Sequence, residues 1–153
     1  MDPVTQGAFG ANFAQTMSNK KKIIVGSIVG CLAGLAPDLD IFIRSTSDPL
    51  LKLEFHRQFT HSIVFIPIGA LIVTLFSRIL FRKYLSWGET YLFSFFGYAT
   101  HGLLDACTSY GTQLLWPFSN YRFAWNSISI IDPLLTIPTV SYTHLTLPTT
   151  VIV

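Results

Sequence analysis

The chain has 153 residues, of which 50% are hydrophobic and 12% are charged, and its formal net charge is +2. This composition is too apolar for an ordinary soluble domain, and the few basic residues are too scattered for a nucleic-acid-binding surface. We therefore expect a single membrane domain whose partner is the lipid bilayer, with no nucleic acid bound.

The first two predicted elements are a short helix and a membrane helix. Residues 5–17 carry a weak apolar pattern of helical period that is too short and too polar to span a bilayer. After three lysines at 20–22, residues 23–36 are apolar and rich in small residues, and Pro37 should end or kink this helix. Its glycines lie four residues apart and would let another helix approach closely: Gly26, Gly30 and Gly34.

Further apolar segments follow a polar connection at residues 44–60. Residues 62–81 are nearly all apolar and are the clearest candidate to span a membrane. A third apolar segment covers residues 91–106, and a fourth, weaker one starts near Ile128. The sequence thus predicts an all-α fold, a small helical membrane bundle with about three to four apolar helices.

The basic residues predict an orientation. Lysines at 20–22 precede the first apolar segment and Arg82 and Lys83 follow the second, so the positive-inside rule places both clusters in the cytoplasm. The ionisable residues of several segments then meet in one polar site at the non-cytoplasmic face, although Arg44, Lys52 and Arg57 on that side weaken the charge bias. The residues that meet are Asp38, Asp40, His56, His61, His101 and Asp105.

His101 and Asp105 are four residues apart in an apolar segment, so they share one helical face and require a partner, a metal or a water-filled cavity. Imidazole and carboxylate without thiolate suit zinc, manganese or iron. All six residues that meet are therefore candidate ligands of a divalent metal, zinc first among them. Simpler alternatives stay open: a buried hydrogen bond between His101 and Asp105, a helix cap within residues 37–40, and surface positions for His56 and His61.

A bound metal would lower the pKa of water towards neutrality and supply hydroxide to a phosphoryl or acyl centre. We assign catalysis to Asp40, which would hold the metal, and to Arg57, which would clamp an anionic group of the substrate. A surface position or a contact with a lipid headgroup is the alternative for Arg57. Asp132 is a further candidate ligand, and the hydroxyls expected to orient the ligands are those of Thr60, Ser62 and Thr108.

Four stretches resemble the YdjM-like family of membrane-bound metal-dependent hydrolases: MDPVTQGAFGA at 1–11, GLAPDLDIFI at 34–43, HRQFTHS at 56–62 and HGLLDACTSYGTQLLWPFS at 101–119. The resemblance implies a helical protein of the bacterial inner membrane, distantly similar in fold to zinc phospholipase C. It also implies a metal site with the six ligand positions given above. Some relatives have a histidine where this chain has Gln6, and relatives are usually longer, so we expect this chain to be truncated.

From about Val140 the composition changes to threonine, serine and proline, and this tail resembles translated read-through from a sequencing adapter. We therefore place the domain at residues 1–139 and a non-native tail at 140–153, and leave His144 out of the site. Three functions are consistent with the sequence. The first is a metal-dependent hydrolase of a phosphoester or other ester, the second is a non-catalytic metal-binding scaffold or regulator, and the third is an ion transporter.

Overall fold

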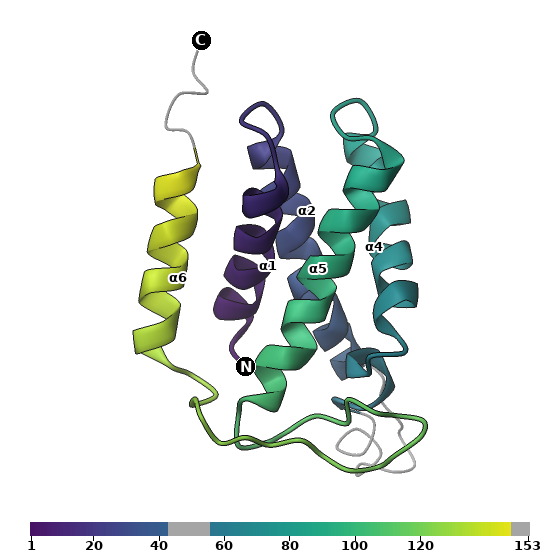
Figure 1. Ribbon diagram of the computed structural model, residues 1–153, viewed down its shortest axis with the longest axis vertical. Helices are drawn as coiled ribbons and strands as arrows, with labels where there is room; N and C mark the ends of the chain where they lie inside the picture. Colours follow the sequence, from purple (N-terminus) through teal and green to yellow (C-terminus); the bar gives the residue numbers. More distant parts are fainter. Residues whose placement is uncertain (43–55, 148–153) are drawn as a thin grey trace.

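Five α-helices make up the regular structure of a computed structural model that describes residues 1–42 and 56–147. They are α1 (Pro3–Met17), α2 (Ile23–Leu35), α4 (Ile66–Phe81), α5 (Trp87–Ala106) and α6 (Pro133–Thr146), with 3-10 helices η1 (Ala36–Phe42) and η2 (Phe59–His61). The predicted all-α class is confirmed (Figure 1). Most of the predicted polar connection, including Arg44 and Lys52, lies outside the described residues.

The helices run as two antiparallel hairpins, α1 with α2 and α4 with α5, whose tight turns lie at the same end of the bundle (Figure 1). α2 and α5 pack on each other in the centre, and α6 lies outside against α1. The basic residues at 20–22 and 82–83 fall in the two turns, where Lys22 Nζ contacts the Glu89 carboxylate oxygens at 2.6 and 2.8 Å. The opposite end carries η1, η2 and the last turn of α5.

Proline and a side-chain cap set two of the helix ends. α2 ends at Leu35 and passes into η1 at Ala36, where an end or kink was predicted. Ala36 keeps α-region backbone, with φ of −61° and ψ of −39°, so the change comes from Pro37 itself, which has no N–H to continue the helical hydrogen bonds. α5 begins at Trp87, four residues before the predicted segment, because Ser86 and Glu89 form a reciprocal capping box.

Two other helices begin later than predicted. α4 starts at Ile66 rather than at position 62, because Ser62 has extended backbone and Ile63 N donates to the Leu114 carbonyl at 2.9 Å. α6 starts at Pro133 rather than near Ile128, because the Asp132 side chain caps the helix by accepting from Leu134 N.

The longest apolar helical segment differs from the predicted one. α2 and η1 together form Ile23–Phe42, 20 residues that are long and apolar enough to cross a membrane. The prediction for residues 62–81 is wrong in length, since α4 has 16 residues, about 24 Å of helix against a hydrocarbon core of about 30 Å. Within the described residues, Ile23–Phe42 alone is both long and apolar enough, since α5 has the length but not the hydropathy and α4 is a shorter apolar helix.

Large apolar side chains point out of the bundle, and small or polar ones point in. On α4 the exposed side chains include Ile68, Leu71, Ile72, Leu75, Phe76, Ile79 and Leu80, whereas the buried residues are Gly69, Ala70, Val73, Thr74 and Ser77. Helices that face lipid on one side and protein on the other have this distribution, because small residues let neighbouring helices approach. The packing thus supports the membrane assignment.

Glycine permits the closest helix crossing. Gly10 of α1 faces the Gly30 carbonyl of α2, and a Cβ on either glycine would overlap the backbone of the other. Gly97 of α5 approaches Gly30 from the other side, where a Cβ would lie 2.6 Å from the same carbonyl. The close approach predicted for the glycines of residues 23–36 is therefore confirmed at Gly30.

The C-terminal helix crosses the predicted domain boundary. α6 continues through Val140 without a break, and on its last turns Thr143 Oγ1 donates to Asn12 Oδ1 of α1 at 2.7 Å. The change in composition near position 140 therefore does not coincide with a change in secondary structure. The domain limits at 1–139 and the non-native origin of residues 140–153 stay predictions.

Candidate metal centre

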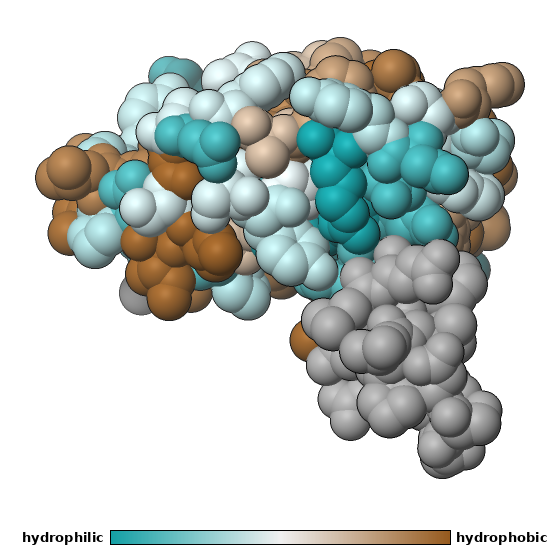
Figure 2. All heavy atoms as spheres, turned by 90° about the horizontal axis from the view of Figure 1, so that it is seen from below, coloured by the Kyte–Doolittle hydropathy of each residue, from teal (hydrophilic) through white to brown (hydrophobic). Residues whose placement is uncertain are grey.

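Four candidate ligands meet at the end of the bundle that carries η1 and η2. α5 presents His101 and Asp105 one turn apart, η1 supplies Asp38 just after the end of α2, and η2 ends on His61. Three of them are buried, and the Asp38 side chain is 27% exposed. Seen from this end, hydrophilic residues form a patch flanked by hydrophobic ones (Figure 2). Three segments distant in sequence thus supply one polar cluster.

Five distances among the four ligand atoms lie close to those of a tetrahedral metal site, and the one between the two imidazole nitrogens is the shortest. His61 Nε2 lies 2.9 Å from His101 Nε2, 3.3 Å from Asp105 Oδ2 and 3.6 Å from Asp38 Oδ1. His101 Nε2 lies 3.3 Å from Asp38 Oδ1 and 3.4 Å from Asp105 Oδ2. Ligands bound tetrahedrally to zinc at about 2.0–2.2 Å lie about 3.3–3.6 Å from one another. The cluster therefore fits a single small cation.

Hydrogen bonds on the far side of each ring direct both Nε2 lone pairs into the cluster. His101 Nδ1 lies 2.6 Å from the Gly34 carbonyl, which can only accept, so Nδ1 carries the proton. His61 Nδ1 lies 2.9 Å from Thr60 Oγ1, whose own proton is donated to Asp40 Oδ2 at 2.9 Å. Two neutral imidazoles with facing lone pairs repel each other unless a cation or a proton lies between them.

Asp105 offers one free oxygen to the cluster. Its Oδ1 accepts from the Gln6 side-chain amide at 2.9 Å and contacts the Met1 amino group. Its Oδ2 lies 3.1 Å from Arg57 Nε, but the two are not aligned for a hydrogen bond, and Oδ2 has no hydrogen-bond partner among the described residues. A buried carboxylate oxygen without a partner is costly, and a metal ion at this position would satisfy it.

Asp40 and His56 lie beside the four-ligand cluster and form a second group with Asp38. Asp40 Oδ1 lies 2.8 Å from His56 Nδ1, and Oδ2 accepts from Arg57 N at 3.1 Å and from Thr60 Oγ1. Both oxygens of Asp40 are therefore engaged by protein donors. Asp40 Oδ2 also lies 3.5 Å from His61 Nδ1, where it orients that ring.

Arg57 lies within the site as a buried cation. Its backbone is in the left-handed region, with φ of 61°, and its side chain turns inward. Nη1 donates to Thr108 Oγ1 at 3.2 Å, and the guanidinium carbon lies 4.9 Å from the centre of the Tyr110 ring. Its role in clamping a substrate stays a prediction. In the structure it faces Asp105.

The charges of the site favour a bound cation. The site holds three carboxylates, those of Asp38, Asp40 and Asp105, and two cations, the Arg57 guanidinium and the Met1 amino group, both of which contact Asp105. With neutral imidazoles, this leaves an excess of negative charge in a largely buried position, which a divalent ion would offset. Donor chemistry, spacing and charge thus agree on a divalent metal, and two imidazoles with two carboxylates suit zinc, manganese or iron.

The other predicted residues have different surroundings. Thr60 contacts both Asp40 and His61, as predicted for an orienting hydroxyl, whereas Ser62 Oγ donates to the Phe59 carbonyl. Asp132 caps α6, and no metal-ligand group within residues 1–42 and 56–147 includes it. His144 lies in the last turn of α6, away from this end of the bundle (Figure 1).

The sequence interpretation missed two supporting groups. The Gly34 carbonyl fixes the His101 ring, a contact from the backbone that the sequence pattern does not indicate. Gln6 was noted for the absence of a histidine, but its side-chain amide is fully buried and holds Asp105. Nothing in the local pattern of α1 indicates that contact.

Comparisons with known proteins agree with the sequence resemblance. The profile described as "YdjM inner membrane protein" matches residues 1–152. The inner membrane protein YbcI of Escherichia coli (strain K12) is 31% identical over 119 residues, which cover 75% of this chain and 68% of YbcI. The uncharacterized protein YfhP of Bacillus subtilis (strain 168) is 29% identical over 109 residues, 71% of this chain but 33% of YfhP. No solved structure gives a significant match.

Proposed function

The chain belongs to the YdjM inner membrane protein family, and we propose that it is a metal-dependent hydrolase of the bacterial inner membrane that acts on a phosphoester or other ester. One observation carries the proposal: two imidazole nitrogens and two carboxylate oxygens, contributed by three separate segments, point at one another at 2.9–3.6 Å. Neutral imidazoles and carboxylates that face one another in this way repel, and a divalent cation between them would offset the repulsion.

Each residue of the centre has a separate task. Asp38, His61, His101 and Asp105 would hold the ion, which when bound lowers the pKa of water and so provides hydroxide at neutral pH. Asp40 and Thr60 hold the His61 ring, and the Gly34 carbonyl holds the His101 ring, so both Nε2 atoms keep their direction.

Access to the centre is from the side of Asp38 and His56. His61, His101 and Asp105 are closed off from solvent, whereas the side chains of Asp38 and His56 are 27% and 24% exposed. A substrate ester would therefore approach over these two residues. His56, hydrogen-bonded to Asp40, is the imidazole nearest to that approach and is placed to exchange a proton with the leaving group.

Burial of the cluster supports a second candidate, a non-catalytic metal-binding scaffold or regulator. A metal held by η1, η2 and α5 would tie two short 3-10 helices to the end of a long α-helix and so stabilise this end of the bundle. The ion-transporter hypothesis ranks last, because the buried ionisable side chains of the described residues gather at one end of the bundle and form no path along it.

Turnover of a substrate panel separates the two leading candidates. Detergent-purified protein is assayed on phosphomonoesters, phosphodiesters and carboxylic esters, beside His101→Ala, Asp105→Asn and the matched control His144→Ala. The hydrolase proposal expects activity that a chelator removes, that zinc, manganese or iron restores, and that only the His144→Ala control retains. Metal bound by a folded wild-type protein without turnover of any ester would instead support the scaffold.

A further inference from the structure

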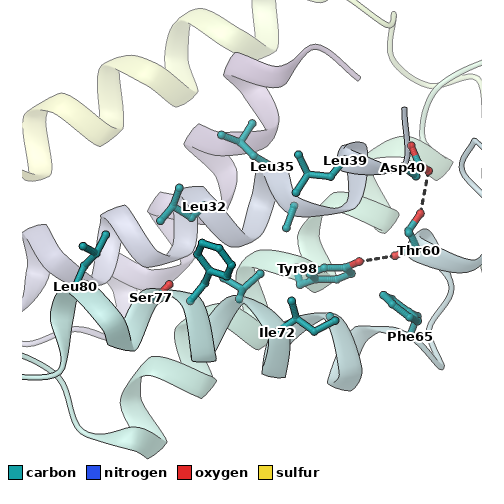
Figure 3. Close-up of a pocket in the computed structure, with 14 residues that line it drawn as sticks. Leu32, Leu35, Leu39, Asp40, Thr60, Phe65, Ile72, Ser77, Leu80 and Tyr98 are labelled. Atoms are coloured by element: carbon teal, nitrogen blue, oxygen red, sulfur yellow. Dashed lines mark hydrogen bonds between the residues drawn. The ribbon is translucent and has the colours of Figure 1, made fainter. Parts of the chain in front are cut away.

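An apolar groove runs along the bundle from the metal centre towards the opposite end (Figure 3). Its volume is about 630 Å³, within the range of about 300–1,000 Å³ typical of sites that enclose a small ligand. α2, η1, α4 and α5 supply its walls. Val73, Ser77 and Tyr98 are buried at its floor, and the exposed side chains at its rim include Leu39, Ile72, Phe76 and Leu80.

The groove is polar at the end next to the metal centre. Asp40 and Thr60 line this end, and Figure 3 shows their oxygens facing each other, with the Tyr98 hydroxyl beside them. Tyr98 donates to the Thr60 carbonyl at 2.9 Å, and Thr60 Oγ1 contacts both Asp40 and His61. Apart from the Ser77 hydroxyl, the remaining lining is apolar. The apolar groove thus ends at the residues that orient the His61 ring.

The length of the groove and its single polar end indicate the kind of molecule that would fill it. Along α4 the lining extends from Gly69 to Leu80, a helical rise of about 16 Å. A helix of a second protein chain would present apolar side chains along its whole length and would leave the polar end, at Asp40 and Thr60, unmatched. An extended hydrocarbon chain does fit, and it would cover the exposed apolar rim while its ester end reaches Asp40.

We infer that this groove holds one acyl chain of a membrane lipid and that the substrates of the metal centre are lipid esters, with the ester just beyond the end of the groove lined by Asp40 and Thr60, on the exposed side of Asp38 and His56. The assignment of lipids as substrates rests on the proposed hydrolase function, whereas lipid binding does not. Hydrolysis consumes one water, whose oxygen bonds to the phosphorus or acyl carbon as the ester bond breaks. One water proton goes to the oxygen of the leaving alcohol, the other belongs to the acid that forms, and no oxidant or reductant is required.

Photo-crosslinking with a matched pair of variants tests the inference. Ile72 and Ile68 are both on α4 and are 52% and 50% exposed, but only Ile72 lines the groove. The protein is placed in phosphatidylethanolamine and phosphatidylglycerol vesicles that contain a phospholipid with a diazirine on one acyl chain. Crosslinked residues are then mapped by mass spectrometry in wild type, Ile72→Trp and Ile68→Trp.

The inference expects crosslinks at groove residues such as Val73 that fall several-fold in Ile72→Trp and persist in Ile68→Trp. A second variant, Leu80→Trp, shortens the far end and should shift binding towards shorter chains. Equal labelling of both isoleucine variants, or labelling spread over the outer face of α4, would mean ordinary surrounding lipid and overturn the inference. So would a lack of labelling at the groove residues of the wild type.

Activity measured on the same samples separates the inference from the proposed function. The assignment of lipid esters as substrates is supported if Ile72→Trp loses hydrolysis of long-chain lipid esters and keeps hydrolysis of a short, water-soluble ester. If Ile72→Trp hydrolyses both equally well, the lipid substrate class is overturned while the hydrolase stands. Groove labelling in a metal-loaded protein without any turnover would leave lipid binding in place and overturn the hydrolase.

Discussion

Replacing Asp40 by asparagine tests whether the contacts behind the ligands hold the metal centre. The carboxylate of Asp40 engages Arg57 N, Thr60 Oγ1 and His56 Nδ1 at 2.8–3.1 Å and lies 3.5 Å from His61 Nδ1. Asparagine keeps one oxygen, which can still accept from Arg57 N and Thr60 Oγ1. It removes the negative charge, and its NH₂ group, which can only donate, then faces His56 Nδ1.

The expected loss follows from these contacts. A hydrogen bond to a charged group contributes about 1.5–3 kcal/mol, and Asp40→Asn removes one such contact and weakens the others. A change of this size corresponds to a roughly 10–100-fold rise in the metal dissociation constant, which is also the usual effect of changing the partner of a metal-binding histidine. Asp40→Asn should therefore bind metal more weakly but keep its fold.

Competition between the protein and a fluorescent zinc chelator measures this dissociation constant, with circular dichroism as the check on helix content. Thr60→Val, which removes the hydroxyl between Asp40 and His61, should give a smaller loss in the same direction. An unchanged dissociation constant in folded Asp40→Asn would show that Asp40 does not orient the ligands, and the account of the centre given above would be refuted.

Three further predictions concern metal, packing and orientation. A chelator should lower the unfolding midpoint of the wild type and added zinc should restore it, because metal at 100 times its dissociation constant stabilises a protein by about 2.7 kcal/mol; an equal chelator effect on His101→Ala would contradict this. Gly30→Ala should cost about 1–3 kcal/mol in thermal unfolding through overlap with α1, while Gly88→Ala, where a Cβ meets nothing within 4 Å, should not; equal midpoints would argue against the close crossing. In intact cells, Ser119→Cys in a cysteine-free background should react with a membrane-impermeant maleimide and Lys21→Cys should not; the reverse pattern would place the metal centre in the cytoplasm.

The helices were predictable where apolar pattern and proline decide the backbone. Residues 23–36 and Pro37 define α2 and its end, because a proline removes a helical hydrogen-bond donor whatever the tertiary context. The start of α4 was not predictable from pattern alone, since it depends on a hydrogen bond from Ile63 N to the distant Leu114 carbonyl. The capping box before α5 is a local signal that the apolar pattern concealed.

The set of candidate ligands was predictable, but the division of labour within it was not. Spacing places His101 and Asp105 on one face, and the orientation of the hairpins brings Asp38 and His61 to the same end. From the sequence, Asp38 and Asp40 are both predicted to be metal ligands. Only the fold shows that Asp38 points into the cluster while protein donors engage both oxygens of Asp40. The groove was also beyond sequence reasoning, because its walls come from four separate elements.

The central claim is that Asp38, His61, His101 and Asp105 hold a metal, and metal content tests it most directly. Inductively coupled plasma mass spectrometry is applied to detergent-purified wild type and to a variant carrying both His101→Ala and Asp105→Ala, with circular dichroism on each. The account predicts about one zinc, manganese or iron ion per wild-type chain, as a four-ligand site requires, and its loss in the variant. A folded wild-type protein that carries no more metal than the variant would contradict the account and leave a buried His–Asp cluster with a structural role.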